Sequence, residues 1–368
     1  MKIAVVIPDL ACGGAEKLCM NLCNYLVATQ EVFLISLCKH TKEMYPLYLL
    51  DSKVNLITLS KHSGLNRELF IRLYRALESI KPSVIHANMA GLLYSAPYIL
   101  KHRQLGVFYT VHTFVKADTP LWYRYFYLCL LKLRRVEIVA NSKAVSKTVQ
   151  KVYGKAYDKY IHIGSRNLSI TENYWRVKQE VANYKPSKGT QVFIHLARIA
   201  PVKNQLLLYK SFNQLFEEGY DVILLVLGQM QSKSIFHQLT KLAHPRIFFL
   251  GRKENIADYL ATVDAFCLTS DYEGLSLATI EAMSMRVIPI CTPAGGVGEV
   301  VKDGYSGFLS EDHTVGGYVN AVKRYFSLND RDKELMRENA FRTYKKDFTI
   351  EQCGEQYLKL YKVYSNYS

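Results

Sequence analysis

Short apolar runs alternate with longer segments of helix-forming residues through the first half of the chain. The runs KIAVVIPDL, EVFLISLC, PSVIHAN, GVFYTVHT and VEIVANS predict buried β-strands. The segments near residues 15–27, 67–80, 91–102 and 143–153 predict helices, and the segment 67–80 is clearly amphipathic. Strands that alternate with helices in this way indicate a doubly wound parallel sheet.

The same pattern starts again after the polar stretch 183–190. Strands are predicted at QVFIHLAR, DVILLVLG, RIFFLG, AFCLTS and RVIPICT, with helices at NQLLLYKSFNQLFEEG and ENIADYLATV between them. We therefore expect an α/β protein with Rossmann-like domains at 1–182 and 183–345, followed by a separate terminal helix within 346–368. Ligands bind beyond the carboxyl ends of the strands in open parallel sheets, so two such sheets facing each other would form a deep cleft.

Length and composition agree with a two-domain enzyme or binding protein. The chain has 368 residues, and 49% of them are hydrophobic. No run of eighteen apolar residues predicts a transmembrane helix. Pro8 and Asp9 interrupt the first apolar run, which therefore indicates a strand instead of a signal peptide, and we expect a cytoplasmic protein. The 8 cysteines include no C-x-x-C pair and are interpreted as buried thiols.

The positive charge is concentrated in the N-terminal half. Residues 1–185 contain 26 Lys and Arg against 12 Asp and Glu, a net charge of +14, whereas the rest of the chain has a net charge of +1. This asymmetry favours contact with an anionic surface or ligand, although solubility alone would be served by scattered charge. No nucleic-acid recognition motif accompanies the high pI, so we expect no nucleic-acid partner.

The stretch DYEGLSLATIEAMSM carries two glutamates after a predicted strand. Glu273 would lie at the carboxyl end of that strand, and Ser276 could cap the following helix. The backbone N–H groups at 275–277 would then form an anion site at the helix start. Glu281 lies further along the helix, where a carboxylate that accepts two hydrogen bonds suits a ribose diol. The alternative is an ordinary loop glutamate with a solvated helix glutamate.

Cations follow another predicted strand in LARIAPVKNQ. Arg198 and Lys203 would lie at the carboxyl end of that strand and beside a helix start, which suits a diphosphate. Plain surface charge is the alternative for such a pair.

Small and titratable residues end two strands of the first half. Gly13 and Gly14 open a helix after the first strand, where a backbone could approach a phosphate or sugar, although neither a dinucleotide fingerprint nor a P-loop is present. His112 ends the strand GVFYTVHT and could donate a hydrogen bond to a sugar hydroxyl or stabilise developing charge. His86 also lies at a strand end and competes for that role.

Together these motifs resemble the GT-B glycosyltransferases, in particular the large retaining family 4. The resemblance covers nearly the whole chain. It is carried by GGAE, the R-x-x-x-x-K pattern from Arg198 to Lys203, FLGRKENIADYL, the E-x7-E pattern from Glu273 to Glu281, and TPAGGVGEVVKDGYSGFL. It implies a GT-B fold whose terminal helix crosses back onto the N-terminal domain.

The resemblance also implies a role for each motif residue. Glu281 would hold the donor's ribose, and Glu273 with His112 would contact the donor sugar as the catalytic pair. The remaining assignments are the donor diphosphate for Arg198, Lys203, Gly14 and the backbone at Leu275, Ser276 and Leu277, and the nucleobase for the backbone near Arg252. The donor sugar, the base and the linkage depend on residues such as Asn88, Gly295 and Gly296 and are left open.

The implied reaction is a retaining sugar transfer from a UDP- or GDP-sugar. No DxD-type pair is evident at a strand end, so we expect a metal-independent enzyme without a cofactor. Front-face attack is the preferred mechanism, because no residue is identified as a covalent nucleophile. Two alternatives stay open: a UDP-sugar 2-epimerase-like GT-B enzyme and a non-catalytic nucleotide-sugar-binding scaffold.

The acceptor is inferred from the basic half. The segment 120–139 mixes aromatic residues, leucines and arginines, and lysines follow at 143, 147, 151, 155 and 159, the first four spaced to stripe one helix face. Such a mixture suits an anionic membrane interface, although a buried helix with solvated lysines would give the same pattern. We expect a lipid-linked or oligosaccharide acceptor and a peripheral enzyme of capsule, O-antigen or lipopolysaccharide synthesis at the inner face of the cytoplasmic membrane.

Overall fold

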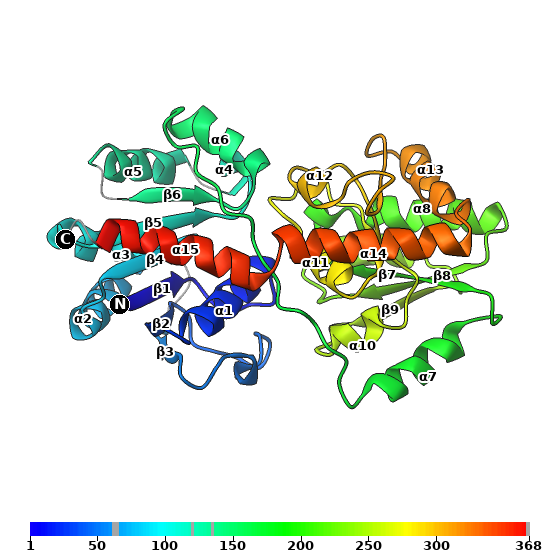
Figure 1. Cartoon of the computed structure of the whole chain (residues 1–368), viewed down its shortest axis with the longest axis horizontal. Coiled ribbons are helices and arrows are strands. Elements are labelled where there is room, and N and C mark those ends of the chain that lie inside the picture. The colour runs from blue at the N-terminus through cyan, green and yellow to red at the C-terminus, as the bar shows by residue number, and fades with distance from the viewer. Residues whose placement is uncertain (61–65, 119–120, 134–135, 366–368) are drawn as a thin grey trace. The chain divides into compact units, whose positions relative to one another are not determined.

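The computed structural model describes residues 1–60, 66–118, 121–133 and 136–365 (Figure 1). The chain forms two compact units. Unit 1 comprises Met1–Ser165 together with the C-terminal segment from Thr349, and unit 2 comprises Arg166–Phe348. The sequence placed the boundaries after residues 182 and 345, whereas the units divide after Ser165 and Phe348. The whole of the helix α7 (Tyr174–Tyr184) therefore lies in unit 2, although the predicted boundary would have divided it.

Unit 1 is built on a parallel sheet with the strand order β3-β2-β1-β4-β5-β6. The strands of this sheet are β1 (Lys2–Ile7), β2 (Glu31–Ser36), β3 (Asn55–Thr58), β4 (Val84–Asn88), β5 (Gly106–Val111) and β6 (Glu137–Ala140). All residues of β4 and β5 are buried, which explains why these strands are mainly apolar and lack an alternation of buried and exposed positions. The half-exposed edge strand β3 was not predicted.

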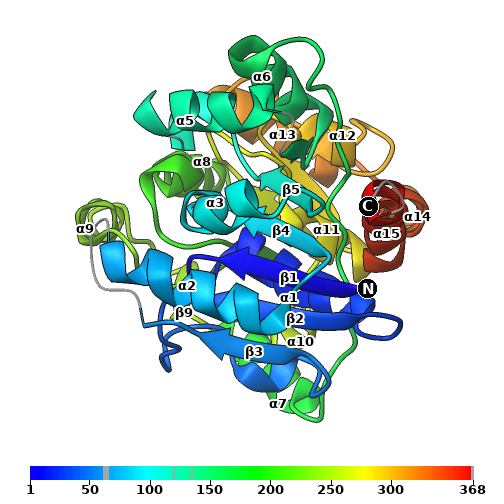
Figure 2. The ribbon, with the colours of Figure 1, turned by 90° about the vertical axis from the view of Figure 1, so that its left-hand side faces the viewer.

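Helices cover both faces of this sheet. The helices of unit 1 are α1 (Gly14–Leu26), α2 (Arg67–Ile80), α3 (Gly91–Lys101), α4 (Val115–Asp118), α5 (Leu121–Lys132), α6 (Lys143–Tyr153) and α15 (Ile350–Ser365), with a short 3-10 helix at Leu47–Leu49. The helices α2, α3, α5 and α6 share one hydrophobic core with the sheet (Figure 2). The terminal helix α15 packs against α1, and the contact requires Gly354, because a Cβ there would lie 2.1 Å from the Tyr25 ring.

Unit 2 repeats the architecture with the strand order β12-β11-β10-β7-β8-β9. Its strands are β7 (Gln191–Leu196), β8 (Val222–Leu227), β9 (Ile247–Gly251), β10 (Ala265–Leu268), β11 (Ile288–Cys291) and β12 (Phe308–Leu309). Its further helices are α8 (Gln205–Glu217), α9 (Lys233–Thr240), α10 (Ile256–Leu260), α11 (Leu277–Ser284), α12 (Val297–Val300), α13 (Val315–Phe326) and α14 (Asp330–Asp347), with a 3-10 turn at Pro201–Lys203.

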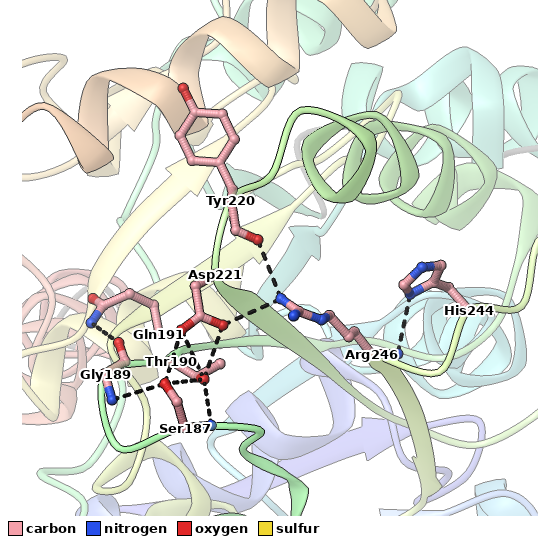
Figure 3. Close-up of polar contacts among 8 residues, drawn as sticks. All are labelled: Ser187, Gly189, Thr190, Gln191, Tyr220, Asp221, His244 and Arg246. Carbon is pink, nitrogen blue, oxygen red and sulfur yellow. Dashed lines mark hydrogen bonds and ion pairs between the residues drawn. The ribbon is translucent and has the colours of Figure 1, made fainter.

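The amino edge of this second sheet is fastened by Asp221 (Figure 3). Its carboxylate accepts hydrogen bonds from Ser187 Oγ at 3.0 Å and from Thr190 Oγ1 at 3.0 and 3.1 Å, and Arg246 lies 3.2 Å away. These contacts join the segments that precede β7, β8 and β9. The polar side chains at this edge therefore hold the sheet together, and the sequence motifs lie at the opposite, carboxyl edge.

Candidate active site

The turns after β7 and β10 are joined at the carboxyl edge of the unit 2 sheet. The Asp271 N–H donates to Val202 O at 2.9 Å, and Thr269 Oγ1 donates to Lys203 O at 3.2 Å. Asn204 Nδ2 donates to Asp271 Oδ1 at 2.8 Å. These bonds bring residues about seventy positions apart in the sequence into one cluster, with Lys203 directly beside the DYEG turn.

Lys203 and Glu273 form an ion pair in this cluster. Lys203 Nζ lies 2.6 Å from Glu273 Oε1, and Ser270 Oγ donates to the same oxygen at 2.7 Å. The two side chains are 21% and 10% exposed, respectively. A charged pair that is largely removed from water, at the carboxyl end of a strand, is an arrangement suited to an ionic ligand.

The helix α11 begins immediately after this pair. Ser276 Oγ accepts a hydrogen bond from the Thr279 N–H at 3.3 Å, so Ser276 is the N-cap, as the sequence predicted. Leu275 and Leu277 on either side are buried. The first-turn N–H groups of a helix have no carbonyl partner within that helix, and the helix dipole adds positive potential there.

Glu281 lies in the second turn of α11 and is only 4% exposed. The alternative of a solvated helix glutamate is therefore wrong for this residue. Ser284 Oγ donates to the Glu281 carbonyl at 2.7 Å. Since α11 starts at the Glu273 turn, one strand–helix unit carries both carboxylates of the E-x7-E pattern.

Arg198 and Arg252 follow β7 and β9 at the same edge of the sheet. The Arg198 carbonyl accepts a hydrogen bond from Gln205 Nε2 at 2.8 Å, and Arg252 pairs with Glu254 at 3.4 Å. Gly228 lets the chain after β8 pass close to the turn after β7 that carries Arg198, because a Cβ at Gly228 would lie 1.9 Å from the Ala197 carbonyl oxygen. All the residues predicted in this half thus lie at one sheet edge, with a direct contact between Lys203 and Glu273.

A buried histidine beneath the site was not predicted. His195 is fully buried in β7, its Nδ1 lies 2.9 Å from Cys267 O, and its Nε2 lies 3.3 Å from Gln205 Nε2. Burial lowers the pKa of His195 to about 4, and the Lys203 charge acts in the same direction. The sequence signal that could have identified it is a histidine between Ile194 and Leu196, in the otherwise apolar part of the strand QVFIHL.

In unit 1, His112 follows β5 and is held by two asparagines. Its Nε2 lies 2.8 Å from Asn88 Oδ1, and its carbonyl accepts from Asn141 Nδ2 at 2.8 Å. Burial lowers the pKa of His112 to about 4. Gly14 is the first residue of α1 and follows the N-cap Gly13, at the same edge of the sheet as His112.

His86, the competing histidine, is structural. It is 2% exposed, and both ring nitrogens are engaged, with Thr110 Oγ1 at 2.6 Å and with Tyr361 OH at 2.7 Å. Tyr357 OH lies 2.8 Å from the same Thr110 hydroxyl. His86 therefore ties α15 to the sheet of unit 1.

The helices α5 and α6 carry the aromatic and basic segment, and Figure 1 shows them on the same side of β6. Leu121, Trp122, Tyr125 and Leu133 are 54–64% exposed. On α6, Lys143, Lys147 and Lys151 are exposed, but the helix ends at Tyr153. The predicted stripe is therefore wrong for Lys155, which follows the C-cap Gly154, and Arg134 and Arg135 lie outside the described residues.

A surface depression of about 540 Å³ lies elsewhere in unit 1, at the amino ends of β4 and β5. Glu78, Lys101 and His102 line it, and Glu78 Oε1 accepts from Lys101 Nζ at 3.2 Å and from His102 Nε2 at 3.1 Å. Its position away from the carboxyl ends of the strands separates it from the motifs described above. Within the described parts of the chain, no helix is long and apolar enough to cross a membrane.

Two family descriptions match consecutive parts of the chain. Residues 12–163 match Glycosyltransferase Family 4, and residues 177–343 match Glycosyl transferases group 1. Together they extend over both units and include every motif that carried the resemblance. The chain belongs to the group 1, family 4 glycosyltransferases, and it is a glycosyltransferase.

Curated relatives extend this assignment. The chain is 31% identical to N-acetyl-alpha-D-glucosaminyl L-malate synthase of Bacillus anthracis, over 48% of this chain and 47% of that protein. It is 25% identical, over 98% of both chains, to a Campylobacter jejuni alpha-1,4-N-acetyl-D-galactosaminyltransferase named for a diNAcBac-PP-undecaprenol-linked glycan. It is 24% identical to an Escherichia coli UDP-Gal:alpha-D-GlcNAc-diphosphoundecaprenol alpha-1,3-galactosyltransferase, over 95% and 93% of the chains.

A solved structure confirms the GT-B fold. HepE of Anabaena, crystallised with UDP and glucose, superimposes with a TM-score of 0.83 at 19% identity and covers 99% of this chain and 100% of its own. The predicted α/β fold of two Rossmann-like units is thus confirmed.

Proposed function

We propose that the chain transfers a sugar from a UDP- or GDP-sugar to a lipid-linked glycan, with retention of configuration and without a metal ion, in bacterial surface polysaccharide synthesis. The observation that carries the proposal is the Lys203–Glu273 pair at the start of α11, with Arg198 at the same sheet edge. Support for the substrates comes from the diphosphoundecaprenol-linked glycans in the names of two relatives and from the UDP and glucose bound to HepE.

The proposed chemistry concerns the leaving group first. The bond between the anomeric carbon and the diphosphate oxygen breaks, and its electron pair moves onto the nucleoside diphosphate. In this proposal Arg198, Lys203 and the backbone N–H groups at 275–277 would stabilise that charge, and their positions after β7 and at the start of α11 support the assignment. The acceptor hydroxyl attacks the same face, and its proton passes to the departing phosphate oxygen.

Glu273 changes partners in this proposal. In the ligand-free chain its carboxylate is held by Lys203 and Ser270. An entering diphosphate would draw the Lys203 ammonium toward itself, and Glu273 would then accept hydrogen bonds from donor-sugar hydroxyls. The Ser270 contact keeps the carboxylate in place during this exchange.

The other assignments follow from position. Glu281, buried in α11, would accept the two ribose hydroxyls, and the backbone near Arg252 would contact the base. In unit 1, Gly14 would approach a phosphate and His112 would contact the donor sugar, since both lie at the carboxyl ends of their strands.

We also propose that unit 1 lies against an anionic membrane surface. The exposed residues Leu121, Trp122 and Tyr125 of α5 fall within an arc of about 100° on a helical wheel, and the exposed Leu133 directly follows the helix, so this face is apolar with aromatic side chains. The exposed lysines of α6 supply the complementary charge for acidic headgroups. Vesicles with anionic lipid should bind the chain at low salt, and loss of binding in Trp122→Ser/Tyr125→Ser is expected; equal binding to neutral vesicles would contradict the charge argument.

The function is tested with purified protein and a panel of UDP- and GDP-sugars in the presence of EDTA. We expect slow hydrolysis of one donor in the absence of acceptor, release of the nucleoside diphosphate, and a sugar whose first-formed anomer matches the donor when followed by NMR. Glu273→Gln should abolish turnover, whereas the exposed-residue control Glu68→Gln should not. Conversion of the donor to its epimer would favour the epimerase alternative, and nucleotide binding without turnover would favour the scaffold.

A further inference from the structure

Asn88 is the last residue of β4, next to the strand that leads to His112. It pairs with Thr110 of β5 and is 1% exposed. A buried amide must place its oxygen against a donor and its nitrogen against acceptors. The surroundings of Asn88 therefore determine which end of the amide faces the histidine.

Two backbone carbonyls fix the nitrogen end of this amide. Asn88 Nδ2 lies 3.4 Å from His86 O and 3.5 Å from Val6 O. Carbonyl oxygens accept hydrogen bonds and cannot donate them, so the opposite orientation would place three oxygens together. Asn88 Oδ1 consequently points at His112 Nε2, at 2.8 Å.

The oxygen end of the amide then determines the tautomer of His112. Because Asn88 Oδ1 can only accept, the proton of the neutral ring must be on Nε2, and the lone pair is left on Nδ1. The pKa of His112, about 4 because of burial, means that the ring is neutral near pH 7. Among the residues that the structure describes, none hydrogen-bonds to Nδ1, while Asn141 holds the backbone of His112 in place.

We propose that Asn88 is a positioning residue that makes His112 a hydrogen-bond acceptor, so that the ligand must present a hydroxyl to Nδ1. This inference rests on the proposed function and changes one of its expectations, since the sequence suggested a histidine that donates. It also sets a specificity: a donor sugar that lacks the contacted hydroxyl leaves the Nδ1 lone pair unsatisfied in the complex.

The tautomer can be measured without any substrate. Protein labelled with ¹⁵N-histidine should show, for the ring signal that disappears in His112→Gln, a protonated Nε2 and an unprotonated Nδ1 at pH 7. Asn88→Leu, which removes the acceptor, should shift the signal toward a mixture of tautomers. A wild-type ring protonated on Nδ1, or an unchanged tautomer in Asn88→Leu, would overturn the proposal.

Asn88→Asp provides a second readout. A carboxylate at 2.8 Å would stabilise the imidazolium, so the pKa of His112 should rise by at least one unit in an NMR titration, and below that raised pKa Nδ1 would carry a proton and become a donor. If a donor is turned over, one of its monodeoxy analogues should lose at least tenfold in kcat/KM with wild type, and less with Asn88→Asp when the assay pH is below the pKa of His112 measured in that variant. The spectra decide the tautomer whether or not the protein turns over a sugar, so failure of this inference and failure of the proposed function are separate results.

Discussion

The ion pair between Lys203 and Glu273 can be evaluated quantitatively. Two unit charges 2.6 Å apart attract by about 6 kcal/mol at an effective dielectric constant of 20. Dehydration of two groups that are 21% and 10% exposed cancels a large part of this attraction. We therefore expect a net coupling free energy of about 2 kcal/mol, below the cost of breaking a fully buried pair.

A double-mutant cycle measures this coupling. Urea unfolding of wild type, Lys203→Met, Glu273→Gln and the double variant gives four free energies, and the non-additive part is the coupling. The pair of Glu68 and Arg72 on α2 is a matched control, because its atoms are also 2.6 Å apart while its side chains are 60% and 43% exposed. The same cycle at that pair should give about 0.3–0.5 kcal/mol.

Equal couplings at the two pairs would refute the reasoning. Such a result would mean that the Lys203–Glu273 pair is as well hydrated as a surface pair, and that a ligand entering the site would gain little from its charges. A coupling several times that of the control pair would support a partly dehydrated, charged site at the start of α11.

Further predictions concern the α11 cap, the turn beneath Arg198 and the acid stability of unit 1. Ser276→Ala should lower the unfolding free energy by about 1 kcal/mol and weaken UDP binding in calorimetry, since the cap orders the first-turn N–H groups. Gly228→Ala should lower kcat/KM at least tenfold, because its Cβ would displace the chain that carries Arg198. His86, whose pKa is about 3 in the fold against 6.5 ordinarily, binds a proton mainly on unfolding. Its contribution alone should lower the free energy of unfolding by about 1.4 kcal/mol for each pH unit that the pH falls between 6 and 4, and His86→Phe should remove that part of the slope in urea titrations.

Controls separate these effects from general destabilisation. Ser232→Ala removes an equivalent cap from α9 and should cost similar stability without changing UDP binding. Gly219 also has a positive φ but faces open space, so Gly219→Ala should strain the backbone and leave kcat/KM unchanged. Loss of UDP binding in Ser232→Ala, unaltered kinetics in Gly228→Ala, or an unchanged pH slope in His86→Phe would each contradict the corresponding argument.

The fold was largely predictable because strands buried on both faces are continuous apolar runs. Within each sheet, the strands that were missed are short edge strands, Asn55–Thr58 and Phe308–Leu309, which lack such a run. The domain boundary was placed seventeen residues late, because a polar stretch at 183–190 is a more visible break than the exposed segment near Arg166. Lys155 was wrongly assigned to the helix stripe, because α6 ends at Tyr153 and Gly154 is its C-cap.

The site was predictable in composition but not in geometry. Motif residues at strand ends could be placed at a sheet edge from the sequence. The contact between Lys203 and Glu273 could not, because it depends on side-chain conformations and on hydrogen bonds between turns that are distant in the sequence. The same is true of Gln205 and His195, whose mutual contact is buried and follows no sequence periodicity.

The central claim is that the carboxyl edge of the unit 2 sheet holds the donor's diphosphate. A crystal structure with UDP bound tests it most directly. The account predicts phosphate oxygens within hydrogen-bonding distance of Arg198, Lys203 and the first-turn N–H groups of α11, with the ribose hydroxyls on Glu281. A diphosphate bound away from these groups would contradict it.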